Sequence, residues 1–283
     1  MLKHRLIFGT LMTMAFIGIV LLDGWIDGSI TSAPDDNNYV RGTLFALLVA
    51  FLIVLGLFEL SKLAAAKGMR ILLPVSIPTT VMLATCPYWT VFFSEVSYEV
   101  LLAFGVMACF LYQRVRYGIS GVLANCSGAC FSILYLGLLG AFAPAVYIDF
   151  GPWHLLMLVF VVKCSDIGAY TIGCLCGKHK FSPVISPKKT WEGMAGGVAL
   201  AVVVAFGFAV FCDIMPWWLG ALFGMTFAFL GQLGDLAESM LKRDAQTKDA
   251  SNNVPGFGGI LDVVDSILIT APFGYLFFSV LGR

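Results

Sequence analysis

The feature that most limits how this chain can fold is the recurrence of long apolar stretches along its whole length. A bilayer core about 30 Å thick needs about 20 mostly apolar residues for each helical span. Hydrophobic residues make up 59% of the 283 residues and charged residues only 12%, so little chain remains for a soluble domain. The sequence predicts an all-α, polytopic integral membrane protein with about nine transmembrane helices, in the stretches 5–22, 43–60, 71–92, 96–112, 120–141, 152–174, 194–212, 216–232 and 260–280.

The lysines and arginines are unevenly distributed among the segments that connect these stretches. Positive residues are retained on the cytoplasmic side of a membrane. If the N-terminus is cytoplasmic, most of the 17 basic residues fall in cytoplasmic segments; Arg41 and Arg283 fall outside, and Lys163 lies within a span. The many spans that follow favour an uncleaved first span over a signal peptide. The formal net charge of zero indicates no nucleic-acid partner.

The two halves of the chain differ in where their polar residues lie. Residues 1–150 carry few ionisable groups within their spans, and we interpret them as a scaffold of transmembrane helices. Residues 151–283 have polar residues within or beside the spans, together with the two longest cytoplasmic loops, 175–193 and 233–258. We therefore expect any chemistry in the C-terminal region.

The stretch 152–174 contains the sequence KCSDIGAY. Lys163, Asp166 and Tyr170 are spaced so that all three lie near one helix face. Ionisable residues inside a membrane are costly and mark functional sites by default. The alternative is a self-neutralising pair that only holds helices together.

The next segment, 177–193, reads GKHKFSPVISPKKTWEG. Lysines at a membrane edge commonly serve as topology signals or contact anionic head groups. Here a turn at Ser186 is followed by the cation of Lys189, the hydroxyl of Thr190 and the acid of Glu192, just before a helix. This order is a plausible start for a phosphate-binding helix.

If the helix of span 216–232 continues, Asp235, Glu238, Ser239 and Lys242 form one stripe along it. The alternative is a merely solvated face. The stripe is contiguous with a membrane helix and leads toward the polar segment KRDAQTKDASNNVPGFGGILDVVDS, so we favour a site.

That segment combines Lys248 and Asp249 with a glycine-rich loop that includes Gly258 and Gly259. Glycines let backbone N–H groups approach a ligand closely. Asp262 and Asp265 follow on one face at the start of the last span, where they either complement the helix dipole or hold a hard cation such as Mg²⁺. Acids, bases and glycines together indicate phosphoryl or nucleotidyl transfer.

These motifs resemble those of the membrane-bound phosphatidate cytidylyltransferases, or CDP-diacylglycerol synthases, over about residues 160–275. The family signature is met by Ser239, Lys242, Arg243, Lys248, Asp249, Ser251, Pro255, Gly258, Gly259, Asp262 and Asp265. Upstream motifs match at Asp166, Ala169, Tyr170, Gly177, Lys178, Ser186, Pro187, Lys189, Thr190, Glu192, Gly193, Gly234, Asp235, Glu238 and Ser239. The resemblance implies that CTP and phosphatidic acid react to give CDP-diacylglycerol and pyrophosphate, with Mg²⁺ or Mn²⁺ as cofactor.

The resemblance also suggests roles for individual residues. The expected catalytic residues are Asp235, Lys242, Arg243, Asp262 and Asp265. The expected metal ligands are Asp235, Asp262 and Asp265, with Asp166 and Asp249 as additional ones. The expected substrate-binding residues are Ser186, Lys189, Thr190, Glu192, Ser239, Lys248, Gly258 and Gly259. The site would face the cytoplasm from a bacterial inner membrane, and a homodimer is left open.

Two positions depart from the signature. Phe257 stands where the family has His, and Val263 where it has Arg. Phenylalanine cannot exchange a proton, and the loss of arginine removes a permanent cation. Because the acids and the Lys-Arg pair remain, we expect a divergent member that keeps metal-assisted chemistry. The alternatives are an inactive homologue, another CTP-dependent enzyme acting on a lipid phosphate or polyprenol, and a transporter that uses Asp166, Lys163 and Asp262 as an ion relay.

Overall fold

The computed structural model describes residues 2–30, 41–93, 95, 97–247, 251 and 258–281. The helices, in chain order, are α1 (Leu2–Ile26), α2 (Thr43–Ala66), α3 (Leu73–Ala84), α4 (Cys86–Phe92), α5 (Tyr98–Tyr117), α6 (Val122–Ser132), the π-helix η2 (Ile133–Leu138), α7 (Leu139–Phe150), α8 (Pro152–Cys176), α9 (Trp191–Phe211), α10 (Trp217–Asp244) and α11 (Leu261–Leu281). One isolated bridge joins two described residues, Lys180 and Thr190. The all-α expectation is confirmed.

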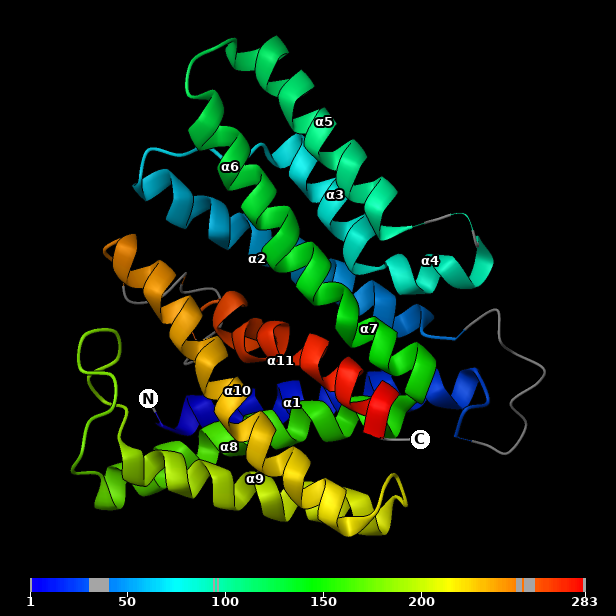
Figure 1. Ribbon diagram of the computed structural model, residues 1–283, viewed down its shortest axis with the longest axis vertical. Helices are drawn as coiled ribbons and strands as arrows, with labels where there is room; N and C mark the ends of the chain where they lie inside the picture. Colours follow the sequence, from blue (N-terminus) through cyan, green and yellow to red (C-terminus); the bar gives the residue numbers. More distant parts are fainter. Residues whose placement is uncertain are drawn as a thin grey trace.

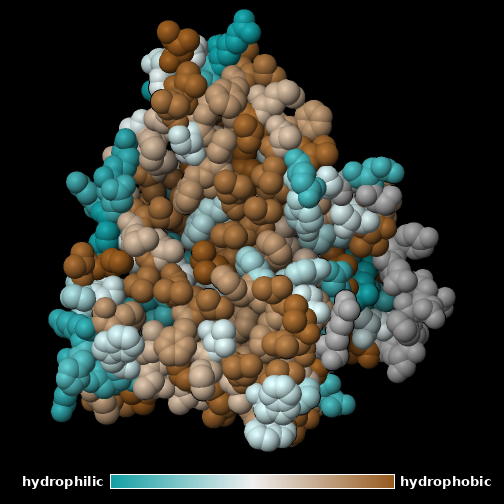
Figure 2. Space-filling model, in the orientation of Figure 1, coloured by the Kyte–Doolittle hydropathy of each residue, from teal (hydrophilic) through white to brown (hydrophobic). Residues whose placement is uncertain are grey.

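Eight helical stretches in the described part of the chain are long and apolar enough to cross a membrane. Large apolar side chains such as Phe104 and Leu175 are exposed on their outer surfaces. Figure 2 shows apolar side chains over most of the face drawn, with hydrophilic ones gathered mainly near its margins. A soluble protein rarely exposes apolar patches of this extent, so the polytopic membrane class is confirmed.

The expected span 71–92 is divided at Thr85 into α3 and α4, neither of which reaches the length of a span. Pro87 lies in the first turn of α4, where its missing N–H would have no helical partner in any case, and it cannot continue a preceding helix. The exact count of nine transmembrane helices therefore stays a prediction. The expected span 120–141 is longer than predicted, because α6, η2 and α7 form one helical stretch, Val122–Phe150.

Figure 1 shows the N-terminal helices α3, α5 and α6 at one end of the molecule and α8, α9 and α10 at the other, with α2, α7 and α11 between them. Helix α8 packs on α9, α9 on α10, α10 on α11 and α11 on α7, while α2 contacts α11. Phe223 and Phe227 of α10 and Phe278 of α11 stack in the buried core. These apolar contacts join α10 and α11 away from the polar halves of the two helices.

Glycines allow α8 and α9 to approach closely. A Cβ atom added to Gly168 of α8 would lie 2.6 Å from the carbonyl oxygen of Gly196 in α9, and one added to Gly193 would lie 2.7 Å from the carbonyl oxygen of Ala169. Small residues at helix interfaces are typical of membrane proteins, in which close backbone packing supplies much of the association. This interface fixes the segment between α8 and α9.

The segments expected in the cytoplasm lie on one side of the molecule. The N-terminal end of α1, the connection between α8 and α9, and the C-terminal end of α10 all lie toward the left of Figure 1. The structure revises one boundary of the expected loop 233–258, since residues 233–244 are the end of α10. The longer helix places polar residues on a rigid element, as the stripe hypothesis required.

Candidate active site

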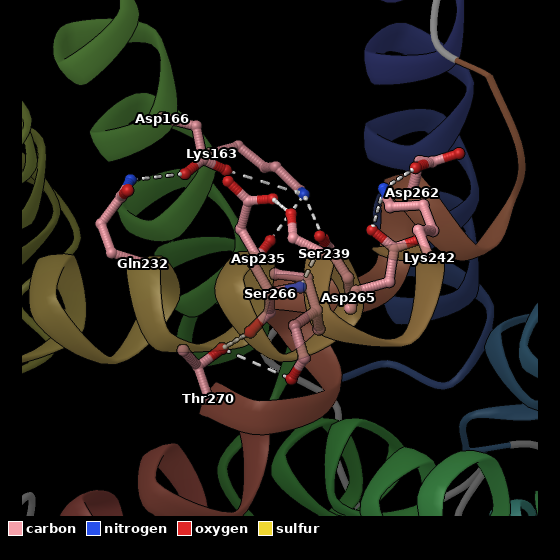
Figure 3. Close-up of polar contacts among 12 residues, drawn as sticks. Lys163, Asp166, Gln232, Asp235, Ser239, Lys242, Asp262, Asp265, Ser266 and Thr270 are labelled. Atoms are coloured by element: carbon pink, nitrogen blue, oxygen red, sulfur yellow. Dashed lines mark hydrogen bonds and ion pairs between the residues drawn. The ribbon is translucent and has the colours of Figure 1, made fainter. Parts of the chain in front are cut away.

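Acidic side chains from three helices meet where the polar ends of α8, α10 and α11 adjoin (Figure 3). Because α10 remains helical to Asp244, Asp235, Glu238, Ser239 and Lys242 share one face of it. The helical continuation on which this stripe depended is confirmed. Asp265 lies on α11, in the second turn after the helix begins.

Three of these acids form a compact cluster. Asp235, Glu238 and Asp265 each offer a carboxylate oxygen, and these oxygens all lie within 4.8 Å of one another. Glu238 is 0% exposed and Asp265 is 4% exposed, whereas Asp235 is only partly buried. Like charges at this separation in a poorly solvated site repel strongly, so cations are needed beside them.

Lys163 of α8 is one of these cations. Its Nζ donates to Ser266 Oγ at 2.7 Å and lies 3.8 Å from Asp265 Oδ1 and 3.9 Å from Asp166 Oδ2. Asp166 also accepts from Gln232 Nε2 at 3.1 Å, as Figure 3 shows. Lys163 thus links two helices as well as two carboxylates, which goes beyond a self-contained pair within α8.

Two further lysines come from other segments. Lys189, which precedes α9, lies 2.6 Å from Asp235 Oδ2. Lys242 of α10 lies 2.5 Å from Glu238 Oε2 and also pairs with Asp262 of α11. The site therefore brings together acids and bases that are far apart in sequence, and a polyanionic substrate can compete for these lysines.

Asp262 opens α11. Besides pairing with Lys242, it accepts a hydrogen bond from Gly259 N at 2.7 Å through its other carboxylate oxygen. Gly258 has a φ of +96°, which favours glycine. A Cβ at Gly259 would lie 2.3 Å from Glu59 Oε2. Both glycines therefore have a structural reason to be present, beside the ligand approach expected from the sequence.

The segment 177–190 is organised by backbone contacts and by two of the expected substrate-binding residues. Thr190 Oγ1 accepts from Gly193 N at 3.1 Å and so caps α9. Glu192 accepts from the backbone N–H of Lys178 and His179 at 3.1 Å and contacts the His179 ring at 2.6 Å. These contacts hold the segment in the shape that presents Lys189 to Asp235.

Arg243 and Ser186 lie at the edge of the cluster. Arg243 Nε donates to Ile185 O at 3.3 Å, and Ser186 O accepts from Lys189 N at 3.1 Å. In the described part of the chain, none of the four residues Ser186, Thr190, Glu192 and Arg243 makes a hydrogen bond or ion pair with the three clustered acids. Ser239 does contact Asp235, at 3.5 Å. Lys248, Asp249 and Phe257 lie outside the described residues.

The cluster fits a hard divalent cation. Such ions take oxygen ligands, usually including one or two carboxylates. Oε1 of the buried Glu238 accepts a hydrogen bond from no residue that the structure describes, whereas Oε2 lies 2.5 Å from Lys242 Nζ. Buried carboxylates ordinarily have their lone pairs satisfied, so Oε1 of Glu238 leaves a coordination site free for a metal.

Sequence reasoning placed the expected metal ligands differently from this cluster. Asp235 and Asp265 belong to it, but Asp262 and Asp166 are paired with Lys242 and Lys163, and Glu238 was absent from the metal assignment. Glu59 of α2 was missed entirely, although it lies against the start of α11. A lone acid inside the apolar stretch 43–60 is the signal that identifies it.

Comparisons with known proteins find one matching family and several similar proteins. The model of the cytidylyltransferase family matches residues 38–281. A protein of Mycobacterium bovis named phosphatidate cytidylyltransferase is 37% identical over 160 residues, which cover 56% of this chain and 52% of that protein. A protein of the same name from Staphylococcus epidermidis is 43% identical over 120 residues, which cover 42% of this chain and 46% of that protein. Another from Bacillus subtilis is 42% identical over 128 residues, which cover 45% of this chain and 48% of that protein. The matched part of the chain thus spans about half the length of these relatives.

Proposed function

Because the chain belongs to the cytidylyltransferase family, we propose that it is a phosphatidate cytidylyltransferase, which converts CTP and phosphatidic acid into CDP-diacylglycerol and pyrophosphate. The observation that carries this proposal is the cluster of Asp235, Glu238 and Asp265 at the polar ends of membrane helices, with three lysines beside it. The names of the relatives favour phosphatidate as the lipid substrate.

The reaction joins two polyanions. A phosphate oxygen of phosphatidate attacks the α-phosphorus of CTP, the bond between the α-phosphorus and the bridging oxygen breaks, and pyrophosphate leaves with that oxygen. Phosphatidate is already ionised near neutral pH, so the attacking oxygen does not need a strong base. This chemistry is compatible with Phe257 at the position where the family signature has histidine.

The main task of the residues is to neutralise and align the phosphates. Lys189 pairs with Asp235 and Lys242 pairs with Glu238, and both lysines would turn from these carboxylates toward phosphate oxygens when substrate binds. Arg243, at the edge of the site, and Lys248 are proposed to contact phosphates. Ser186, Thr190, Glu192, Ser239, Gly258 and Gly259 remain proposed substrate-binding residues.

We propose Asp235, Glu238 and Asp265 as the residues that would hold Mg²⁺ or Mn²⁺. Such an ion, when bound, neutralises charge on the reacting phosphates and orients them. Asp166 pairs with Lys163 and Asp262 pairs with Lys242, so each is linked to the cluster through a lysine, and both are proposed as supporting acids. Asp249 is proposed as a further metal ligand.

The membrane determines the side from which each substrate reaches the site. The lipid tails would stay in the bilayer while CTP enters from the cytoplasm, the side that the lysine and arginine distribution predicts for the site. Holding one substrate in the membrane also removes part of the entropy cost of bringing the two together. A bacterial inner membrane is the proposed location.

Pyrophosphate release by the purified protein in detergent tests this function. The assay contains CTP, Mg²⁺ and dioleoyl phosphatidic acid, with diacylglycerol as the control lipid and EDTA as the control for metal. We expect pyrophosphate only with phosphatidic acid and only without EDTA. Release of CDP with diacylglycerol would instead identify a lipid kinase, and no turnover of either lipid by folded protein would reject the proposal.

A further inference from the structure

Glu59 is a fully buried acid in α2, within the N-terminal half that the sequence presents as a scaffold. Its side chain is 0% exposed, and it lies inside an apolar span. A carboxylate in such a place is costly unless other groups stabilise it. The groups that do so belong to the other end of the chain.

Among the described residues, the carboxylate of Glu59 receives hydrogen bonds from Ser251 and from Ile260 and Leu261 at the start of α11. Oε1 accepts from Ser251 Oγ at 2.5 Å and from Ile260 N at 3.1 Å. Oε2 accepts from Leu261 N at 2.9 Å. Ser251 and Ile260 stand on either side of the glycine-rich segment of the signature, so a single side chain joins both ends of this segment to α2.

The neighbouring glycine supports a specific fit. The three atoms nearest to a Cβ built on Gly259 all belong to the Glu59 carboxyl group, at 2.3, 2.8 and 3.0 Å. Any side chain at position 259 would displace the carboxylate from its donors. The sequence thus leaves room at Gly259 for the acid of a distant helix.

The bonds also decide where α11 begins. The first N–H groups of a helix lack partners within the helix, and a negative charge beside them is favourable. Glu59 supplies both the acceptor and the charge from outside α11. Its donors, Ile260 and Leu261, immediately precede Asp262, and Asp265 follows three residues after Asp262. The position of both acids relative to α10 therefore depends on α2.

We propose that Glu59 is a positioning residue, which fixes the start of α11 and both ends of the signature segment so that Asp265 meets Asp235 and Glu238. The proposal rests on the proposed cytidylyltransferase function. It assigns the N-terminal half a direct part in building the site.

Asp23 provides a matched control. It is also 0% exposed, and it caps the start of α2 from α1 by accepting from Leu44 N at 3.3 Å and Phe45 N at 3.0 Å. It lies near the end of α1, away from the acid cluster. Glu59→Gln and Asp23→Asn each remove one buried charge from a cap that another helix supplies, so they separate loss of stability from loss of positioning.

The experiment measures turnover and Mg²⁺ dependence of the three purified proteins below their unfolding temperatures. We expect Glu59→Gln to lower kcat by about tenfold or more and to raise the Mg²⁺ concentration for half-maximal rate, as losses of groups that orient metal ligands do. Asp23→Asn should leave both quantities within about twofold of wild type. Equal behaviour of the two variants, or unchanged kinetics in Glu59→Gln, would overturn the proposal.

Hydrogen exchange separates failure of this proposal from failure of the proposed function. Peptides covering 258–266 should exchange faster in Glu59→Gln and at the wild-type rate in Asp23→Asn, whether or not the protein turns over phosphatidate. Unchanged exchange would reject Glu59 as the anchor of α11. If Glu59→Gln does not fold, Ser251→Ala removes one of the bonds that described residues donate to Glu59 and should shift kinetics and exchange in the same directions by less. Wild-type values of both would reject the proposal.

Discussion

The three lysines decide how three carboxylates can share one poorly solvated site. Lys163, Lys189 and Lys242 come from α8, from the segment before α9 and from α10, and each lies beside a different acid of the cluster. Replacing one acid by a neutral side chain of the same shape changes the balance of charge in the site without opening a cavity. Asparagine in place of aspartate is such a replacement.

Asp265→Asn tests the importance of the cluster for turnover. We expect the rate of pyrophosphate release to fall by at least about 100-fold, the loss typical when a group that stabilises transition-state charge is removed. The protein should remain folded, because the amide keeps the volume of the buried side chain. Asp149→Asn is the control: Asp149 accepts from Tyr275 at 2.8 Å on α7, remote from the cluster, and its variant should keep wild-type turnover. Substantial activity in Asp265→Asn would remove this acid from the catalytic machinery.

The residues of the site were partly predictable from local pattern. Asp235, Glu238 and Lys242 follow from helical spacing alone, since one face of a continuing helix must carry all three. Glu59 does not, and neither do the contacts of Lys163 with Ser266 and Asp265, because these partners are on other helices and spacing says nothing about which helices touch. The sequence presents Glu238 only as a member of a stripe, and its buried Oε1, which has no hydrogen-bond partner among the described residues, distinguishes it as a candidate metal ligand.

The same limit applies at the level of helices. Hydropathy locates the apolar stretches, but it shows neither the break at Thr85, which follows from Pro87, nor the continuation of α10 through polar residues. The α8–α9 pair illustrates how much such contacts matter, since it positions Lys189 through close backbone packing rather than through large side chains. A methyl group added at this interface should therefore destabilise the protein.

Gly168→Ala is expected to lower the thermal stability of the protein in detergent. The added Cβ would lie 2.6 Å from the carbonyl oxygen of Gly196, a backbone atom that cannot rotate away, and overpacking of this kind costs about 1–3 kcal/mol. Gly207→Ala on α9 is the matched control, because a Cβ there meets no atom within 4 Å. The control should leave the unfolding temperature unchanged or raise it slightly. An equal unfolding temperature for Gly168→Ala would show that α8 and α9 can separate without cost.

For the whole molecule, the decisive question is which side of the membrane the acid cluster faces. The connection between α8 and α9 and the end of α10 lie on one side of the structure, and their lysines predict that this side is cytoplasmic. Two native thiols report on the two sides. Cys176 ends α8 on the side of the cluster and is exposed, whereas Cys212 follows α9 at its opposite end.

Labelling with a membrane-impermeant maleimide in spheroplasts tests this orientation, with variants that retain only Cys176 or only Cys212. Burial raises the pKa of the Cys212 thiol, and the thiolate is the reactive form, so labelling is done at alkaline pH. We expect Cys212 to react in intact spheroplasts and Cys176 only after the membrane is permeabilised. A thiol that stays unreactive in detergent is replaced by a new cysteine in the same connecting segment. The reverse order of labelling would place the lysines and the acid cluster outside, away from cytoplasmic CTP, and would contradict both the orientation and the proposed route of the nucleotide.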